Sequence, residues 1–283
     1  MQLGPDKTEL LARARADLRM GVPVVLRDGD SLAIALSAET CDAKRLKALQ
    51  SNGGDLHLAI SARRLERVEA LAAGLREAHG VQARAHQLDV TDRNAVRAYV
   101  QELESDGFAV DILVNNAGKA RGKEKLHEGD PDDWEEMIDT NVKGLLYMSR
   151  AVLPHMVERN KGHVINIGSI AGRWVYPGGN VYNATKYAVY ALNEGMNIDL
   201  LGTRVRVSSV DPGLTQTEFS KVRFHGDTEK AASVYDDTVP LTGADVADAV
   251  VYVANTPPHV DVLNLVLMPT DQRHAMLVRR DEG

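Results

Sequence analysis

Tyr182 and Lys186 stand four residues apart in the sequence Tyr-Asn-Ala-Thr-Lys. On a helix this spacing places both side chains on one face. A tyrosine titrates at about 10, too high for acid–base work at neutral pH, but a lysine cation beside it favours the phenolate and lowers its pKa. Ser169 lies thirteen positions before Tyr182, at the predicted end of a strand, where its hydroxyl can hold a carbonyl oxygen. The pattern suits proton transfer at a substrate oxygen, although alone it fits an exposed structural helix pair better.

The elements that must position these residues alternate between strand and helix from residue 55 onward. Apolar strands are predicted at 56–60, 110–114, 163–167, 205–210 and 262–268, with a shorter strand ending at 87–90. Helices are predicted after residue 65 and at 93–103, 131–157, 182–197 and 243–254. This alternation predicts an α/β fold, a Rossmann-like doubly wound parallel sheet with helices on both faces. Ligands bind at the carboxyl ends of such strands, where 115–118, 168–169 and 211–213 fall.

Composition narrows the class of protein. The 283 residues are 44% hydrophobic and 26% charged, as in ordinary globular proteins. The net charge of -7 argues against nucleic acid or an anionic membrane as a partner. The single cysteine excludes an intrachain disulfide, and no Cys/His cluster has metal-site spacing. The first twenty residues are too charged for a secretory segment, and no apolar run reaches spanning length. We therefore expect a cytoplasmic protein without a metal.

The wider set of motifs resembles the short-chain dehydrogenase/reductase family. Asn-Asn-Ala-Gly at 115–118, Asp-Thr-Asn-Val-Lys-Gly around Asn141, then Ser169, Tyr182, Lys186 and Asp-Pro-Gly at 211–213 occur in the family's order and spacing. The resemblance implies that Tyr182 is the general acid/base and that Lys186 lowers its pKa and binds the nicotinamide ribose. Ser169 would position the substrate oxygen, and Asn141 would complete a proton relay through water. Cofactor contacts are implied at a further set of positions: Asp89, Val90, Asn116, Pro212 and Gly213.

Longer stretches are similar to one branch of this family. They are MIDTNVKGLLYMSRAVLPHMVERNKGHVINIGS, GGNVYNATK and TEFSKVRFHGD. The branch oxidises 3-hydroxy acids and includes NADP-dependent serine and L-allo-threonine dehydrogenases. The resemblance implies hydride transfer between NADP(H) and a small 3-hydroxy acid in a homo-oligomer, a tetramer or a dimer. Arg223 is a candidate clamp for the substrate carboxylate, because a guanidinium pairs bidentately with one, and it fits a solvated loop arginine equally well.

Arg63 and Arg64 directly follow a predicted strand and precede a helix. Cations at a helix N-terminus oppose the macrodipole, so local stability does not explain them. In a dinucleotide fold this position meets the adenosine ribose, where an acid selects NAD and an arginine accommodates the 2′-phosphate of NADP. The pair therefore favours NADP over NAD, the alternative being that both are merely exposed charges.

The N-terminal segment departs from the family. The glycine-rich phosphate loop should fall at 37–44, where the chain reads Ser-Ala-Glu-Thr-Cys-Asp-Ala-Lys without a glycine. A strand at 32–36 and a helix at 43–49 keep the expected element order, whereas 22–36 also fits a β-hairpin. Residues 8–49 resemble the N-terminal region of bacterial GTP cyclohydrolase II proteins without their zinc-binding cysteines. We therefore divide the chain into an atypical segment, 1–54, and a short-chain dehydrogenase/reductase domain, 55–283.

Two functions follow from these observations. The complete catalytic set favours an NADP-dependent oxidoreductase acting on a CH–OH group. The glycine-free segment at 37–44 favours instead a catalytically impaired member or a scaffold that has lost dinucleotide binding.

Overall fold

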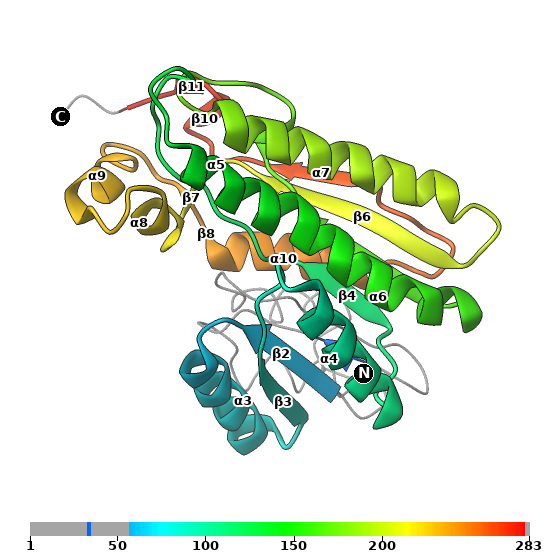
Figure 1. Ribbon diagram of the computed structural model, residues 1–283. Coiled ribbons are helices and arrows are strands. Elements are labelled where there is room, and N and C mark those ends of the chain that lie inside the picture. The colour runs from blue at the N-terminus through cyan, green and yellow to red at the C-terminus, as the bar shows by residue number, and fades with distance from the viewer. Residues whose placement is uncertain (1–32, 35–56, 281–283) are drawn as a thin grey trace, which may run out of the picture.

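The computed structural model describes residues 33–34 and 57–280. Its central sheet is parallel, and its strands are β1 (Ala33–Ile34), β2 (His57–Ala62), β3 (Gln82–Gln87), β4 (Ile112–Asn115), β5 (Gly162–Ile167), β6 (Val205–Pro212) and β9 (Asn264–Leu267). One ladder runs β1-β2-β3 and the other β4-β5-β6-β9, and β1 lies beside β4. With β1 beside β4, the two ladders give the order β3-β2-β1-β4-β5-β6-β9, that of a doubly wound sheet. In Figure 1, β2 and β3 lie on one side of β4 and β6 on the other. The predicted fold class is confirmed.

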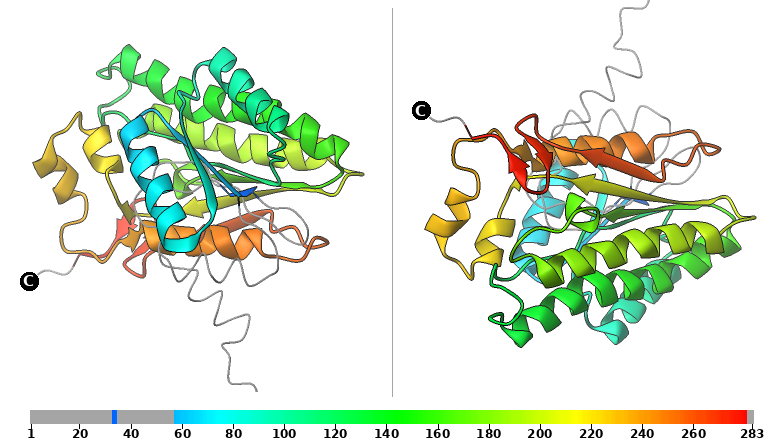
Figure 2. Two further views of the ribbon diagram at one scale, coloured as in Figure 1. Left: turned by 90° about the horizontal axis from the view of Figure 1, so that it is seen from below. Right: turned by 90° about the horizontal axis from the view of Figure 1, so that it is seen from above.

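Helices cover both faces of the sheet. On one face lie α4 (Arg93–Ser105), α5 (Pro131–Ile138), α6 (Leu145–Glu158) and α7 (Asn180–Asp199); on the other lie α3 (Leu65–His79) and α10 (Gly243–Ala254) (Figure 2). Local chemistry sets several helix ends. The Asp92 carboxylate caps α4 by accepting the amides of Asn94 and Ala95, and Thr242 and Asp245 form a capping box on α10. Gly80, at φ 64°, ends α3 in the left-handed conformation that glycine tolerates.

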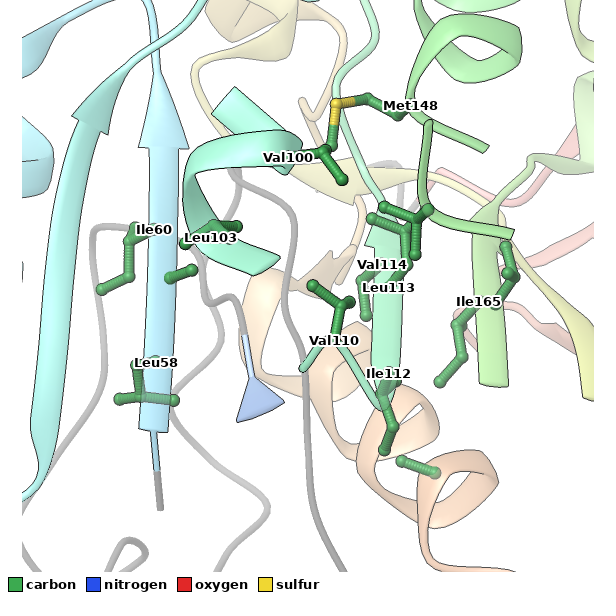
Figure 3. Close-up of a cluster of buried hydrophobic side chains, with 14 of the residues drawn as sticks. Leu58, Ile60, Val100, Leu103, Val110, Ile112, Leu113, Val114, Met148 and Ile165 are labelled. Atoms are coloured by element: carbon green, nitrogen blue, oxygen red, sulfur yellow. The ribbon is translucent and has the colours of Figure 1, made fainter. Parts of the chain in front are cut away.

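The core fills the space between the sheet and these helices. Leu58 and Ile60 of β2, Val114 of β4 and Ile165 of β5 are almost fully buried, and Met148 of α6 lies against Val100 of α4 in the same cluster (Figure 3). A buried polar relay crosses the same layer. Its members are joined by side-chain hydrogen bonds of 3.0 Å, namely Asn115 to Ser149, Asn115 to Asn166 and Asn166 to Asn193. Each buried amide is thereby given a partner, which burial demands.

The structure differs from the prediction in several elements. The helix predicted over 131–157 is interrupted by a π-helical turn, Asp139–Gly144. The strand expected to end at 87–90 ends at Gln87. The prediction missed several short elements: a 3-10 turn at Ile170–Gly172, β7 (Thr215–Gln216), α8 (Phe219–Arg223), α9 (Thr228–Ser233), β8 (Leu241–Thr242), β10 (Gln272–His274) and β11 (Leu277–Val278).

Most of the atypical N-terminal segment lies outside the described residues. That includes the expected phosphate loop at 37–44, the helix at 43–49, the resemblance over 8–49 and the hairpin strand at 22–26. The described pair Ala33–Ile34 pairs in parallel with His57 and Leu58 of β2, as expected for a strand at 32–36 in this fold. The division at residue 54 stays a prediction. No helix among the described residues is both long and apolar enough to cross a membrane.

Candidate active site

Tyr182 and Lys186 lie on the first turns of α7 and are 8% and 7% exposed. Lys186 Nζ donates to the Ile167 carbonyl oxygen at 2.9 Å and lies 6.0 Å from the centroid of the Tyr182 ring. Ser169 follows β5 and caps a 3-10 turn, where its Oγ accepts the Ala171 amide at 3.1 Å. The structure therefore brings the three predicted catalytic side chains to one place at the carboxyl end of the sheet.

Burial dominates the titration of this group. It raises the pKa of Tyr182 above its usual value, while the Ser169 hydrogen bond and the Arg223 cation oppose that rise. Burial also lowers the pKa of Lys186 to about 8, with the Asp211 carboxylate opposing the change. Tyr176 adds to the rise in the pKa of Tyr182, Arg223 is the cation that opposes it, and the predicted lowering by Lys186 stays a prediction. A lysine that titrates near neutrality can exchange protons as well as hold a ligand.

Asn141 is held rigidly in the π-helical turn between α5 and α6. Its Oδ1 accepts the Lys119 amide at 2.8 Å, and its Nδ2 donates to the Lys119 carbonyl at 2.8 Å and to Thr185 Oγ1 at 3.0 Å. A Cβ on Gly118 would lie 3.4 Å from Asn141 Oδ1 and 3.6 Å from Lys186 Nζ, so Gly118 separates the two side chains. Asn141 is therefore placed behind the Lys186 ammonium. π-helical turns often mark functional sites.

A cavity of about 450 Å³ opens over these residues. Asn116, Ser169, Tyr182 and Lys186 contribute to its wall together with Pro212, Gly213 and Arg223, all of them predicted site residues. Its lining includes a set of cationic side chains: Lys123, Lys186, Arg223, Lys230 and Arg280. Among the described residues that line it, there is no Asp or Glu. Such a cavity favours an anionic ligand.

Arg223, on α8, reaches back over the catalytic tyrosine. Its Nε donates to the Gly122 carbonyl at 2.9 Å and its Nη1 to the Tyr176 hydroxyl at 3.0 Å. Its guanidinium carbon lies 5.9 Å from the centroid of the Tyr182 ring. The remaining nitrogen, Nη2, is buried and finds no hydrogen-bond acceptor within the described part of the chain. A buried charged donor left in this way is costly unless a ligand accepts from it.

The residues after β6 form the wall opposite α7. Pro212 ends β6, and Gly213 donates its amide to the Leu267 carbonyl at 2.8 Å. A Cβ on Gly213 would come within 2.6 Å of Gln272 Oε1, which accepts the Leu214 amide at 2.7 Å. A side chain at position 213 would therefore displace Gln272. Gln272 thus fixes the loop that carries two predicted cofactor contacts.

Four predicted cofactor residues lie outside the cavity wall. The charge of Arg63 and hydrogen bonds from Thr91 outweigh burial and keep the pKa of Asp89 below its usual value. Val90 packs toward the π-helical turn, because a Cβ on Gly144 would lie 2.6 Å from Val90 Cγ2. Arg63 is exposed, and Arg64 forms an ion pair of 3.0 Å with Glu218. These residues follow the ends of β2 and β3, and none of them lines the cavity that holds Tyr182.

Sequence reasoning missed several residues of the site. Tyr176 and Gly122 seat Arg223, Gln272 fixes the loop after β6, and Phe219 lies edge-on to Tyr182 with ring centroids 5.6 Å apart. The residue types gave little warning, since each contact joins segments far apart in the chain. Only Phe219 stood in a stretch already singled out, TEFSKVRFHGD.

Comparison with known proteins identifies the family. Residues 46–228 match the family described as short chain dehydrogenase. Over 216 residues the chain is 50% identical to the NADP-dependent 3-hydroxy acid dehydrogenase YdfG of Salmonella typhi, covering 76% of this chain and 86% of that protein. It is 39% identical to the NADP-dependent 3-hydroxy acid dehydrogenase of Schizosaccharomyces pombe, over 80% and 87% of the two chains. The chain therefore belongs to the short-chain dehydrogenase family, as its motifs predicted.

Solved structures agree with this assignment. The closed form of a serine dehydrogenase complexed with NADP+ is 44% identical, with a TM-score of 0.76 over 88% of this chain and 99% of that one. The serine dehydrogenase from Escherichia coli is 40% identical, with a TM-score of 0.66 over 83% and 96% of the two chains. The predicted similarity to the branch that oxidises 3-hydroxy acids is confirmed.

Proposed function

We propose that this chain is an NADP-dependent dehydrogenase that interconverts a small 3-hydroxy acid, of the serine, L-allo-threonine or 3-hydroxypropionate type, and its 3-oxo acid. The observation that carries the proposal is the grouping of Ser169, Tyr182 and Lys186 beneath a cavity lined by cations. Relatives that are 50% and 53% identical over 216 and 192 aligned residues are NADP-dependent 3-hydroxy acid dehydrogenases, which supports the same cofactor and substrate class.

The described residues fit NADP. An ammonium has three donor positions, and Lys186 uses one on the Ile167 carbonyl, which leaves donors for ribose hydroxyls. Gly168 is part of the cavity wall, and a side chain there would displace Asp211, because a Cβ would lie 2.0 Å from Asp211 Oδ1. Asn116, Pro212 and Gly213 would bound the nicotinamide end, whereas the adenosine end would face Arg63, Arg64, Asp89 and Val90. When bound, NADP+ supplies the acceptor for the hydride.

The chain's own residues would then handle the proton and the substrate. Tyr182 takes the hydroxyl proton during oxidation and returns it during reduction, while Ser169 Oγ holds the same substrate oxygen. Lys186 stabilises the phenolate form, and Asn141 supports the proton path that leads away from it. Arg223 Nη2 binds the substrate carboxylate, which would give this buried nitrogen its acceptor.

A titration followed by kinetics tests the proposal. Purified protein is added to NADPH, and the cofactor's fluorescence is followed; a saturable change at submillimolar concentration is expected. Tyr182→Phe should leave this binding nearly unchanged and reduce turnover of L-serine or 3-hydroxypropionate by about 100- to 10,000-fold, the usual contribution of a general acid/base. Absence of NADPH binding by the wild type would favour instead an impaired member or scaffold with an altered phosphate loop.

We further propose that the chain acts in the cytoplasm as a homo-oligomer, a tetramer or a dimer. Large apolar side chains stand exposed on α6, at Leu146 and Val157, and around the end of α7, at Ile198 and Leu201, which supports burial against further copies. Light scattering of the purified protein would give the assembly state, and a monomeric mass would contradict it.

A further inference from the structure

Glu218 binds two arginines that lie far from it in the sequence, Arg67 at 151 residues and Arg64 at 154 residues. It precedes α8, between the cavity residues Thr217 and Phe219, and its carboxylate reaches the start of α3. Oε2 accepts from Arg64 Nη2 at 3.0 Å and from Arg67 Nη1 at 2.9 Å, and Oε1 accepts from Arg67 Nη2 at 3.1 Å. Arg67 is therefore gripped bidentately, and Arg64 is held beside it.

The three side chains are partly open to solvent, which a ligand at this place requires. Their exposed fractions are 55% for Arg64, 36% for Arg67 and 40% for Glu218. Hydrogen bonds from Arg67 and Arg64 hold the pKa of Glu218 at about 2, so the carboxylate is charged throughout the neutral range. Glu218 adds one negative charge to a pair of guanidinium groups, and the cluster carries a net charge of +1.

Carboxylate and phosphate are the two anions that the guanidinium fork binds bidentately. The inference rests on the proposed function, in which the 2′-phosphate of NADP would approach Arg64 at the end of β2. There Glu218 already accepts from Arg64 Nη2 and from both Nη atoms of Arg67. We propose that Glu218 competes with the 2′-phosphate for Arg64 and Arg67 and thereby sets how strongly the enzyme prefers NADP over NAD.

The position of Glu218 gives this competition a second consequence. The next residue, Phe219, lies edge-on to Tyr182, and Arg223 at the far end of α8 lies over the same ring. The ion pairs thus tie the cofactor end of the site to the segment that covers the substrate end. A phosphate that displaces Glu218 from the arginines would also break the ion pairs that connect α8 to α3.

Binding constants measured by calorimetry test the competition without turnover. Adenosine 2′,5′-bisphosphate carries the 2′-phosphate and 5′-AMP lacks it, and NADPH and NADH form the same contrast. Glu218→Gln should tighten binding of NADPH and of the bisphosphate about fivefold, the effect of removing one or two partly exposed ion pairs. Binding of NADH and 5′-AMP should change less than twofold.

The control is Asp106→Asn, which removes a partly exposed ion pair with Arg84 at the remote end of α4 and should change no binding constant. In an Arg64→Gln, Arg67→Gln background the gain from Glu218→Gln should vanish. The proposal is overturned if Glu218→Gln weakens NADPH binding, leaves it unchanged, or tightens all four ligands equally. A wild type that binds no NADPH contradicts instead the proposed function, so the two failures are distinguishable.

Discussion

Replacing Arg223 tests whether the enzyme recognises a carboxylate. Arg223 Nε donates to the Gly122 carbonyl and its Nη1 to the Tyr176 hydroxyl, which leaves the buried Nη2 for the substrate. One hydrogen bond to a charged group contributes about 1.5–3 kcal/mol, which corresponds to about 10- to 150-fold in kcat/KM. Arg223→Met should therefore lower kcat/KM for 3-hydroxypropionate by at least this factor, through KM because the carboxylate is bound equally in the ground and transition states, and through kcat because the Arg223 cation lowers the pKa of Tyr182.

The neutral analogue 3-hydroxypropionamide separates recognition from architecture. Arg223→Met also removes two of the hydrogen bonds that hold α8, so part of the loss is shared by the acid and the amide. The ratio of their kcat/KM values cancels that shared part. Arg223→Lys should lose less than Arg223→Met for the acid, since it keeps the charge but not the fork. Lys221→Met, on the same helix and exposed, is the matched control. Equal losses for acid and amide would refute the clamp.

Two further predictions concern stability. Burial lowers the pKa of His163 to about 3, so this ring stays neutral in the folded protein while it charges below about 6.5 in the unfolded chain. The free energy of unfolding should therefore fall by about 2 kcal/mol between pH 6.5 and pH 5. Urea unfolding at several pH values should show this fall in the wild type and not in His163→Asn. The same dependence of unfolding free energy on pH in both proteins would contradict the prediction. Gly168→Ala should destabilise by about 1–3 kcal/mol, since its Cβ would clash with Asp211. Its control is Gly195→Ala: Gly195 lies within α7 with open space around its Cβ position, so the substitution should stabilise the protein by about 1 kcal/mol. If Gly168→Ala stabilised the protein equally, the expected clash with Asp211 would be contradicted.

The candidate catalytic residues could be singled out partly because their geometry is local. Tyr182 and Lys186 need only a helix to share a face, and Ser169 needs only a strand end. Parallel strands then bring their carboxyl ends to one edge, so any residue just after a strand becomes a candidate. The same reasoning placed Asn116 and the Pro212–Gly213 loop at the cavity.

The π-helical turn shows where local reasoning stops. The apolar spacing over 131–157 predicted a continuous helix and gave no sign of the π-helical turn at Asp139–Gly144. The turn is sustained by contacts with Lys119 and Thr185, which belong to other segments. The proton-relay role expected of Asn141 came only from the family resemblance. The hydrogen bonds that hold its side chain are seen only in the structure.

Net charge illustrates a further gap between composition and function. The chain carries a net charge of -7, which argues against a polyanionic partner, yet its cavity is lined by five cations without a carboxylate among the described residues. The two facts are compatible because a ligand responds to the field within a low-dielectric cavity, where nearby charges dominate, and distant surface carboxylates are screened by solvent and salt. The sign of a small ligand's charge is therefore decided by which few side chains the fold brings together. Lys123, Arg223, Lys230 and Arg280 come from four separate segments, and no local pattern predicts that they converge.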